Sequence, residues 1–124
     1  MKKILVLIVE DEETISRALR DFLTHTDNVY EVIVVEDGKE ALEKVTTDAF
    51  DLVLLDIVMP KMDGWQFLEE VKKRDIKSKI IVLTNLDEKE SKARAKDFGV
   101  VNYFVKNETT LAMLTERINS VLKE

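Results

Sequence analysis

Cysteine is absent from this 124-residue chain, and histidine, proline and glycine are scarce. Without cysteine the protein has no disulfides, thiolate metal ligands or catalytic thiols, which fits a reducing compartment. The single histidine, His25, lies in the polar segment THTDN and is interpreted as a solvated loop residue. Three scattered glycines supply no glycine-rich phosphate loop, which argues against nucleotide hydrolysis and nucleotide-dependent redox chemistry.

Long apolar runs and an excess of positive charge are also missing. The apolar run at 4–9 is too short for a secretory signal and is followed by four acidic residues, and no segment is long enough to span a bilayer. The net charge of -6 argues against binding of nucleic acid or an anionic membrane by this chain alone. We therefore expect a cytoplasmic protein with no direct nucleic-acid or membrane contact.

Short apolar runs alternate with segments of helical periodicity along the chain, whose length suits one domain over residues 1–124. Consecutive apolar residues predict buried strands, and the run with Glu31 predicts a less buried edge strand. The predicted strands are 4–9, 29–35, 52–55, 80–83 and 103–105. Apolar spacing predicts helices around 15–23, 41–45, 67–71, 87–98 and 111–122, of which 87–98 is charged on nearly all sides and weakly anchored.

This alternation predicts an α/β fold with five helices on both faces of a five-stranded parallel sheet. Right-handed crossovers leave few topologies, and the flavodoxin-like strand order 2-1-3-4-5 is the commonest candidate. We find no internal repeat, low-complexity tract or linker.

Polar residues follow the apolar runs at the carboxyl ends of four predicted strands, where open parallel sheets bind ligands. They are Glu10, Asp11, Asp56, Thr84 and Lys106. At an effective dielectric near 20 and a spacing of about 5 Å, each pair of carboxylates repels by on the order of 3 kcal/mol, so we expect a cation among them. Oxygen ligands without histidine or cysteine suit Mg²⁺. Carboxylates with a divalent cation, a lysine and a hydroxyl beside them are the groups that phosphoryl transfer needs. Asp56 is the best candidate nucleophile among them.

Three of these residues have an ordinary explanation when each is considered alone. Asp11, with Glu12 and Glu13, could favour the start of a helix through capping and the helix dipole. Thr84 could be a simple strand-end residue, and Lys106 could be solvated. Their joint placement at the ends of neighbouring strands favours the functional interpretation.

Five motifs in this order resemble the receiver domain of two-component response regulators, over essentially the whole chain and with chemotaxis-type single-domain receivers as the nearest kind. They are IVEDE (8–12), EDGKEAL (36–42), LLDIVMPKMDGWQFL (54–68), VLTN (82–85) and YFVK (103–106). The resemblance implies that Asp56 accepts a phosphoryl group from a sensor histidine kinase or phosphotransfer protein. It also implies that Glu10, Asp11 and Asp56 form an Mg²⁺ site, completed by the backbone carbonyl of Val58.

The resemblance further implies roles for three residues and for one surface. Lys106 and Thr84 would contact the phosphoryl group, and Tyr103 would act with Thr84 as the switch. The surface of the fourth helix, fifth strand and fifth helix would bind a downstream protein. The chain would be no enzyme beyond its own phosphotransfer and slow autodephosphorylation, and either a monomer or a weak phosphorylation-dependent dimer. We expect a single-domain regulator acting through partners, although a domain of a longer protein would look the same.

Two positions depart from the family pattern. Asn107 follows Lys106 where the family usually has proline after a cis bond, so we expect a trans bond and a reshaped loop here. Asn85 stands where the family mostly has a small residue, and its amide could crowd the phosphoryl site or donate to it. These departures leave open an atypical receiver that binds proteins without phosphorylation. A haloacid-dehalogenase-like phosphatase would need a second aspartate at the position of Val58.

Overall fold

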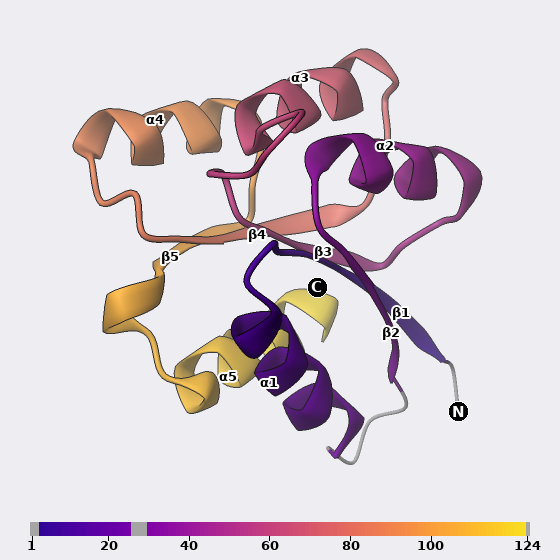
Figure 1. The fold of residues 1–124 in the computed structure, drawn as a ribbon, viewed down its shortest axis with the longest axis vertical. Helices are drawn as coiled ribbons and strands as arrows, with labels where there is room; N and C mark the ends of the chain where they lie inside the picture. Colours follow the sequence, from indigo (N-terminus) through magenta and orange to yellow (C-terminus); the bar gives the residue numbers. More distant parts are fainter. Residues whose placement is uncertain (1–2, 26–29, 124) are drawn as a thin grey trace.

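The computed structural model describes residues 3–25 and 30–123, which form a parallel sheet between two layers of helices (Figure 1). The strands within this part are β1 (Ile4–Val9), β2 (Tyr30–Val35), β3 (Leu52–Leu55), β4 (Lys79–Thr84) and β5 (Asn102–Val105). The helices are α1 (Glu13–Thr24), α2 (Gly38–Thr47), α3 (Gly64–Lys73), α4 (Lys89–Asp97) and α5 (Leu111–Lys123), with a short 3-10 helix, η1 (Lys106–Glu108), before α5.

The sheet has the predicted order, β2-β1-β3-β4-β5, and every described pairing is parallel. The central strands β1, β3 and β4 have nearly continuous burial, whereas β2 exposes Glu31 at the edge. The flavodoxin-like prediction is therefore confirmed. Val29, the first residue of the predicted second strand, lies outside the described residues.

Each face of the sheet is covered by its own set of helices, as Figure 1 shows. Helices α2, α3 and α4 pack on one face in a cluster that includes Leu42, Phe67 and Ala95. Helices α1 and α5 pack on the other face, where Leu19 and Ile118 are buried. Burial of apolar side chains on both faces explains why the strands consist of consecutive apolar residues.

Helix α4 is the least anchored helix, as its charged sequence predicts. Its buried side chains are the small residues Ser91 and Ala95. The guanidinium of Arg94 instead lies over the ring of Trp65 on α3, 4.4 Å from the ring centroid, and Trp65 also contacts Phe98. These aromatic and cation–π contacts were not predicted, because they join helices far apart in sequence.

Candidate functional site

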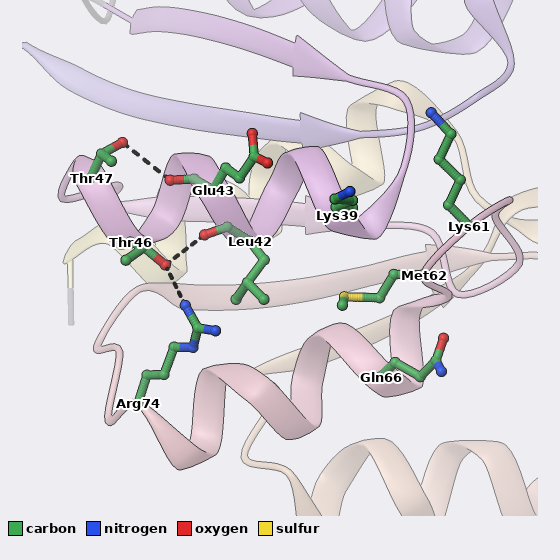
Figure 2. Close-up of a pocket in the computed structure, with 9 residues that line it drawn as sticks. All are labelled: Lys39, Leu42, Glu43, Thr46, Thr47, Lys61, Met62, Gln66 and Arg74. Atoms are coloured by element: carbon green, nitrogen blue, oxygen red, sulfur yellow. Dashed lines mark hydrogen bonds between the residues drawn. The ribbon is translucent and has the colours of Figure 1, made fainter.

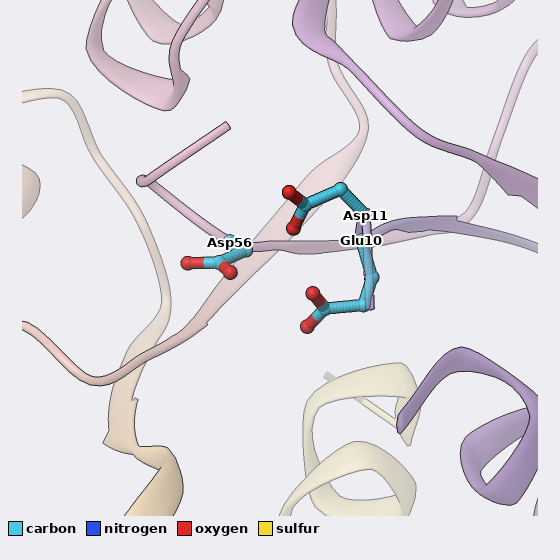
Figure 3. A group of neighbouring side chains, drawn as sticks. All are labelled: Glu10, Asp11 and Asp56. Atoms are coloured by element: carbon cyan, nitrogen blue, oxygen red, sulfur yellow. The ribbon is translucent and has the colours of Figure 1, made fainter. Parts of the chain in front are cut away.

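Three carboxylates meet at the carboxyl ends of β1 and β3. Glu10 and Asp11 directly follow β1, and Asp56 directly follows β3, its neighbour in the sheet. One oxygen from each side chain lies within 4.8 Å of the other two (Figure 3). Glu10 is 3% exposed and Asp56 5% exposed, whereas Asp11 is open to solvent. The oxygen-only ligand set could hold a hard divalent cation.

Lys106 places a single ammonium among these carboxylates from the end of β5. Its Nζ lies 2.8 Å from Oδ2 of Asp56 and 2.5 Å from Oε1 of Glu10, and its side chain is 8% exposed. Burial alone would lower the pKa of Lys106, but hydrogen bonds to Asp56 and Glu10 outweigh it and hold the pKa above its ordinary value. Lys106 is therefore a permanent positive charge beside Asp56.

The buried Glu10 carboxyl is harder to ionise than an ordinary glutamate. Burial raises the pKa of Glu10, and the nearby negative charge of Asp56 adds to that rise. Hydrogen bonds from Lys106 and from the backbone N–H of Glu12 act in the opposite direction. Burial is thus the main reason why the Glu10 carboxyl resists ionisation, and its contact with Lys106 partly offsets that cost.

A small hollow of about 270 Å³ opens onto Asp56, lined by Asp11, Glu12, Asp56, Val58, Thr84, Asn85 and Lys106. Thr84 is fully buried at the end of β4, and its hydroxyl is approached by the backbone N–H of Leu86 at 3.5 Å. Val58, 60% exposed, lies at the mouth, and its backbone N–H donates to Oδ1 of Asp56. The hollow thus gives a small anionic group access to Asp56, with a hydroxyl and an ammonium beside it.

Tyr103 lies outside the lining of this hollow. Its hydroxyl donates to the carbonyl of Leu86, 2.7 Å away, in the connection between β4 and α4. Its side chain is partly buried, and this burial raises the pKa of Tyr103, as do the nearby charges of Glu88 and Asp87. Tyr103 therefore links β5 to the segment that leads into α4.

The loop after Asp56 is held by close backbone packing. A Cβ added to Gly64 would lie 2.6 Å from Cα of Ile57, and the N–H of Gly64 donates to the carbonyl of Ile57. A Cβ on Gly38 would lie 2.3 Å from the carbonyl oxygen of Met62. Asp63 then starts α3 with a capping box to Gln66. These contacts pin both ends of the loop that follows Asp56.

The two positions that depart from the family pattern contact each other. The backbone N–H of Asn107 donates to Oδ1 of Asn85 at 3.2 Å. The Lys106–Asn107 bond is trans, as predicted, and the reshaped loop takes the form of η1. Neither η1 nor this hydrogen bond was predicted, and Lys106 reaches Asp56 without the usual proline.

A larger hollow of about 760 Å³ lies between α2 and α3 (Figure 2), and it shares no lining residue with the hollow at Asp56. Its polar lining is dispersed, and Arg74 is already engaged with the hydroxyl of Thr46 and with Glu70. Apolar side chains such as Leu42 and Met62 form part of the wall. Since no group of carboxylates or nucleophiles converges there, it lacks the chemistry found at Asp56.

Comparison with known proteins identifies the fold family. The sequence model of the response regulator receiver domain matches residues 6–119. The chain belongs to this family. PhoP of Bacillus subtilis, the alkaline phosphatase synthesis transcriptional regulatory protein, is 35% identical over 101 residues, which are 82% of this receiver domain and 41% of PhoP. The transcriptional regulatory protein CiaR of Streptococcus pneumoniae is 32% identical over 118 residues, 95% of this chain and 51% of CiaR. This receiver domain spans about half the length of the curated relatives it matches.

Solved structures of receiver domains superpose over nearly the whole chain. The receiver domain of Francisella response regulator 1452 is 28% identical, with a TM-score of 0.89 and 97% of each chain covered. A CheY-like receiver domain protein of Methanospirillum hungatei is also 28% identical, with a TM-score of 0.90 over 98% of this chain and 95% of its own. These likenesses confirm the receiver fold.

The structure brings together most of the residues selected from the sequence. Glu10, Asp11, Asp56 and Lys106 converge, and Thr84 and Val58 line the same hollow. Tyr103 lies farther out, bonded to Leu86. Sequence reasoning missed Glu12, whose carboxylate lies 3.3 Å from Nζ of Lys106. Its place in the acidic run after β1 was a signal, but it was interpreted as part of a helix start.

Proposed function

We propose that this receiver domain is a phosphorylation-controlled switch that accepts a phosphoryl group on Asp56 from a histidine kinase or phosphotransfer protein. The observation that carries the proposal is the buried contact of Lys106 with Asp56 and Glu10, beside a hollow that also contains Thr84. A buried aspartate with an ammonium and a hydroxyl beside it suits attack on phosphorus. The activity is self-directed phosphotransfer and slow autodephosphorylation rather than turnover of a separate substrate.

The carboxylates fit a magnesium site, because all their donors are oxygen and one atom of each lies within 4.8 Å of the others. Asp11, Asp56 and the carbonyl of Val58 would hold the ion, with Glu10 completing the acidic group. The chemistry that a bound Mg²⁺ supplies is neutralisation of charge and coordination of a phosphoryl oxygen.

The chain's own residues then have distinct roles in the transfer. An oxygen of Asp56 forms a bond to phosphorus while the bond from phosphorus to the donor's imidazole nitrogen breaks, and that nitrogen keeps the electron pair. Lys106 stabilises negative charge on the phosphoryl oxygens, and the hydroxyl of Thr84 donates to one of them. When Lys106 and Thr84 rearrange around the product, the change would pass from Thr84 to Leu86, which precedes α4, and from Leu86 to Tyr103 on β5.

The output surface in this proposal is formed by α4, β5 and α5, where a downstream protein would bind in the cytoplasm. Helix α4 suits a mobile element because its buried side chains are only Ser91 and Ala95 within the described part of the chain. A related receiver domain, that of RstA from Klebsiella pneumoniae, is described as activated by BeF3 and is 28% identical with a TM-score of 0.86.

No described helix is long and apolar enough to cross a membrane.

The decisive experiment measures intact mass after incubation with a small acyl phosphate and Mg²⁺. We expect the wild type to gain one phosphoryl group, and the gain to vanish in Asp56→Asn and in chelator. Asp97→Asn, an exposed carboxylate on α4, is the matched control and should react like the wild type. No adduct with any donor, together with no binding of beryllofluoride, would instead support the phosphorylation-independent interaction module.

A further inference from the structure

The hydrogen bond between Asn85 and Asn107 lies one step beyond the end of the sheet. The last registered pair of β4 and β5 is Thr84 with Val105. Asn85 is the next residue after Thr84, and its side-chain oxygen accepts from the backbone N–H of Asn107 within η1. The side chain of Asn85 thus ties η1 to the end of β4 by a hydrogen bond beyond the last registered pair.

Lys106 occupies the first position of η1 and must reach far across the sheet. It starts from the end of β5, passes the end of β4, and contacts Asp56 after β3 and Glu10 after β1. A long, flexible lysine side chain holds such contacts only when its backbone is fixed, because hydrogen bonds weaken steeply with distance and angle. The backbone next to Lys106 is fixed by the bond from Asn107 to Asn85 on one side.

Within η1 itself the turn is stabilised only locally. The hydroxyl of Thr109 donates to the carbonyl of Val105, and the N–H of Thr109 donates to the carbonyl of Lys106. These bonds shape the turn but do not connect it to β4. The pairing of Val105 with Thr84 holds the residue before Lys106 against β4, and the bond of Asn85 holds the residue after it.

We propose that Asn85 is a positioning residue for Lys106, acting through the N–H of Asn107 so that the ammonium meets Asp56 and Glu10. The effect of this positioning on the reaction rate rests on the proposed phosphorylation of Asp56. The positioning of Lys106 itself is a property of the unphosphorylated chain. Because Asn85 also lines the hollow, the competing possibilities are that its amide crowds the entering group or donates to it directly.

The donor side of the bond offers a matched pair of variants. Asn107→Ala keeps the backbone N–H, whereas Asn107→Pro removes it. Asn85→Ala removes the acceptor. Asn102→Ala is the control for loss of a similar amide bond, since Asn102 accepts from Arg117 at the opposite end of β5. Proline also restricts the backbone of Lys106, so Asn107→Pro changes more than the hydrogen bond. Asn85→Ala is therefore also made in the Asn107→Pro background, where any remaining effect of Asn85 cannot come from its bond to the N–H of residue 107.

Two measurements are made on each variant: the rate of phosphorylation by a small acyl phosphate, and the NMR signal of the Lys106 ammonium without donor. Because neutral hydrogen bonds contribute modestly, we expect Asn85→Ala to lower the rate by about twofold to tenfold. Asn107→Pro should be slower than Asn107→Ala, and Asn85→Ala should have no further effect in the proline background. In both bond-breaking variants the ammonium signal should move towards that of exposed lysines, whereas Asn102→Ala should leave both measurements unchanged.

Several results would overturn the proposal. An Asn85→Ala rate equal to that of the wild type would refute positioning, and a higher rate would show that the amide crowds the site. A full effect of Asn85→Ala in the proline background would show direct contact with the phosphoryl group. If the wild type itself gains no phosphoryl group, the proposed function fails, and the ammonium signal alone decides: an unchanged Lys106 signal in Asn85→Ala then refutes positioning.

Discussion

The ammonium nitrogen of Lys106 lies 2.8 Å from Oδ2 of Asp56, although the two residues are 50 positions apart in the chain. The pair lies with Glu10 in the least exposed part of the site, where all three side chains are at most 8% exposed. A buried charge with its partner removed is costly, whereas an exposed pair contributes little. The site is therefore held together by the same charges that would perform its chemistry.

Replacing Lys106 should destabilise the protein strongly in the absence of divalent ions. In chelator, Lys106→Met leaves the carboxylates of Glu10 and Asp56 without a cation, and we expect the free energy of unfolding to fall by about 3 kcal/mol. Urea denaturation measures this change. The control is Lys92→Met, which removes an exposed pair with Asp87 and should alter the free energy little. Equal losses in the two variants would contradict the importance of burial.

Removing the charge of Asp56 should have an effect that depends on the metal. In chelator, Asp56→Asn relieves repulsion among three carboxylates while Lys106 keeps Glu10 as its buried partner, so the melting temperature should exceed that of the wild type. Mg²⁺ should then stabilise the wild type more than the variant, because binding to the folded state raises its stability. Thermal scans with and without Mg²⁺ test both points, and equal stabilisation of the two proteins would refute a shared site.

Tyr103 should make stability fall at alkaline pH. Its pKa is raised from 10.0 by burial and nearby negative charge, so the unfolded chain loses the phenolic proton first as the pH rises. The stability from this group is therefore complete below pH 10 and is lost as the pH rises through the higher folded pKa. Unfolding in urea at pH values on both sides of 10 should show a steeper fall for the wild type than for Tyr103→Phe. Parallel curves would argue against this assignment.

Arg94 should anchor α4 through Trp65. We expect Arg94→Ala to speed amide exchange along α4 and to lower the free energy of unfolding by about 0.5–1 kcal/mol, the range for an exposed cation–π contact. The fluorescence of Trp65, the single tryptophan, should change as well. Arg17→Ala is the matched control, because Arg17 pairs with Glu13 on α1. Faster exchange in α4 for both variants would indicate a nonspecific effect.

Gly64 should be needed for the loop that follows Asp56. A methyl group there would meet the backbone of Ile57 at 2.6 Å, so Gly64→Ala should destabilise the fold by about 1–3 kcal/mol. It should also slow acyl-phosphate labelling by shifting Asp56. Gly99→Ala introduces a side chain at a φ of 84° but into open space, and it should cost stability without slowing the labelling. Similar labelling of both variants would show that the loop tolerates the shift.

Much of the fold follows from local pattern. Strands such as Leu52–Leu55 are apolar at consecutive positions because helices cover both of their faces, and this pattern marked them in the sequence. The site followed from the same logic, since Glu10 and Asp56 come directly after strands whose carboxyl ends must lie together in a parallel sheet. Helix ends were less well predicted: α1 begins at Glu13, ahead of its first apolar residue.

The remaining features depend on contacts between distant segments. No periodicity could show that Arg94 stacks on Trp65, or that the hydroxyl of Tyr103 meets the carbonyl of Leu86. The sequence left open whether the amide of Asn85 crowds the phosphoryl site or donates to it. In the structure Asn85 lines the hollow, and its oxygen accepts a hydrogen bond from the backbone N–H of Asn107. A side chain's partner depends on distance and angle, which sequence spacing does not supply across separate elements.

By itself, the sequence determined the α/β class, the strand order and the set of charged residues at the strand ends. Buried strands and amphipathic helices each need a recognisable order of apolar and polar residues, and their alternation along the chain indicates the topology. Tertiary structure alone decided which of those charges touch. It placed the ammonium of Lys106 between Asp56 and Glu10 rather than in solvent, and it joined Asn85 to Asn107 behind it. Such contacts are set to fractions of an ångström by the packing of the whole sheet, and only the folded chain specifies them.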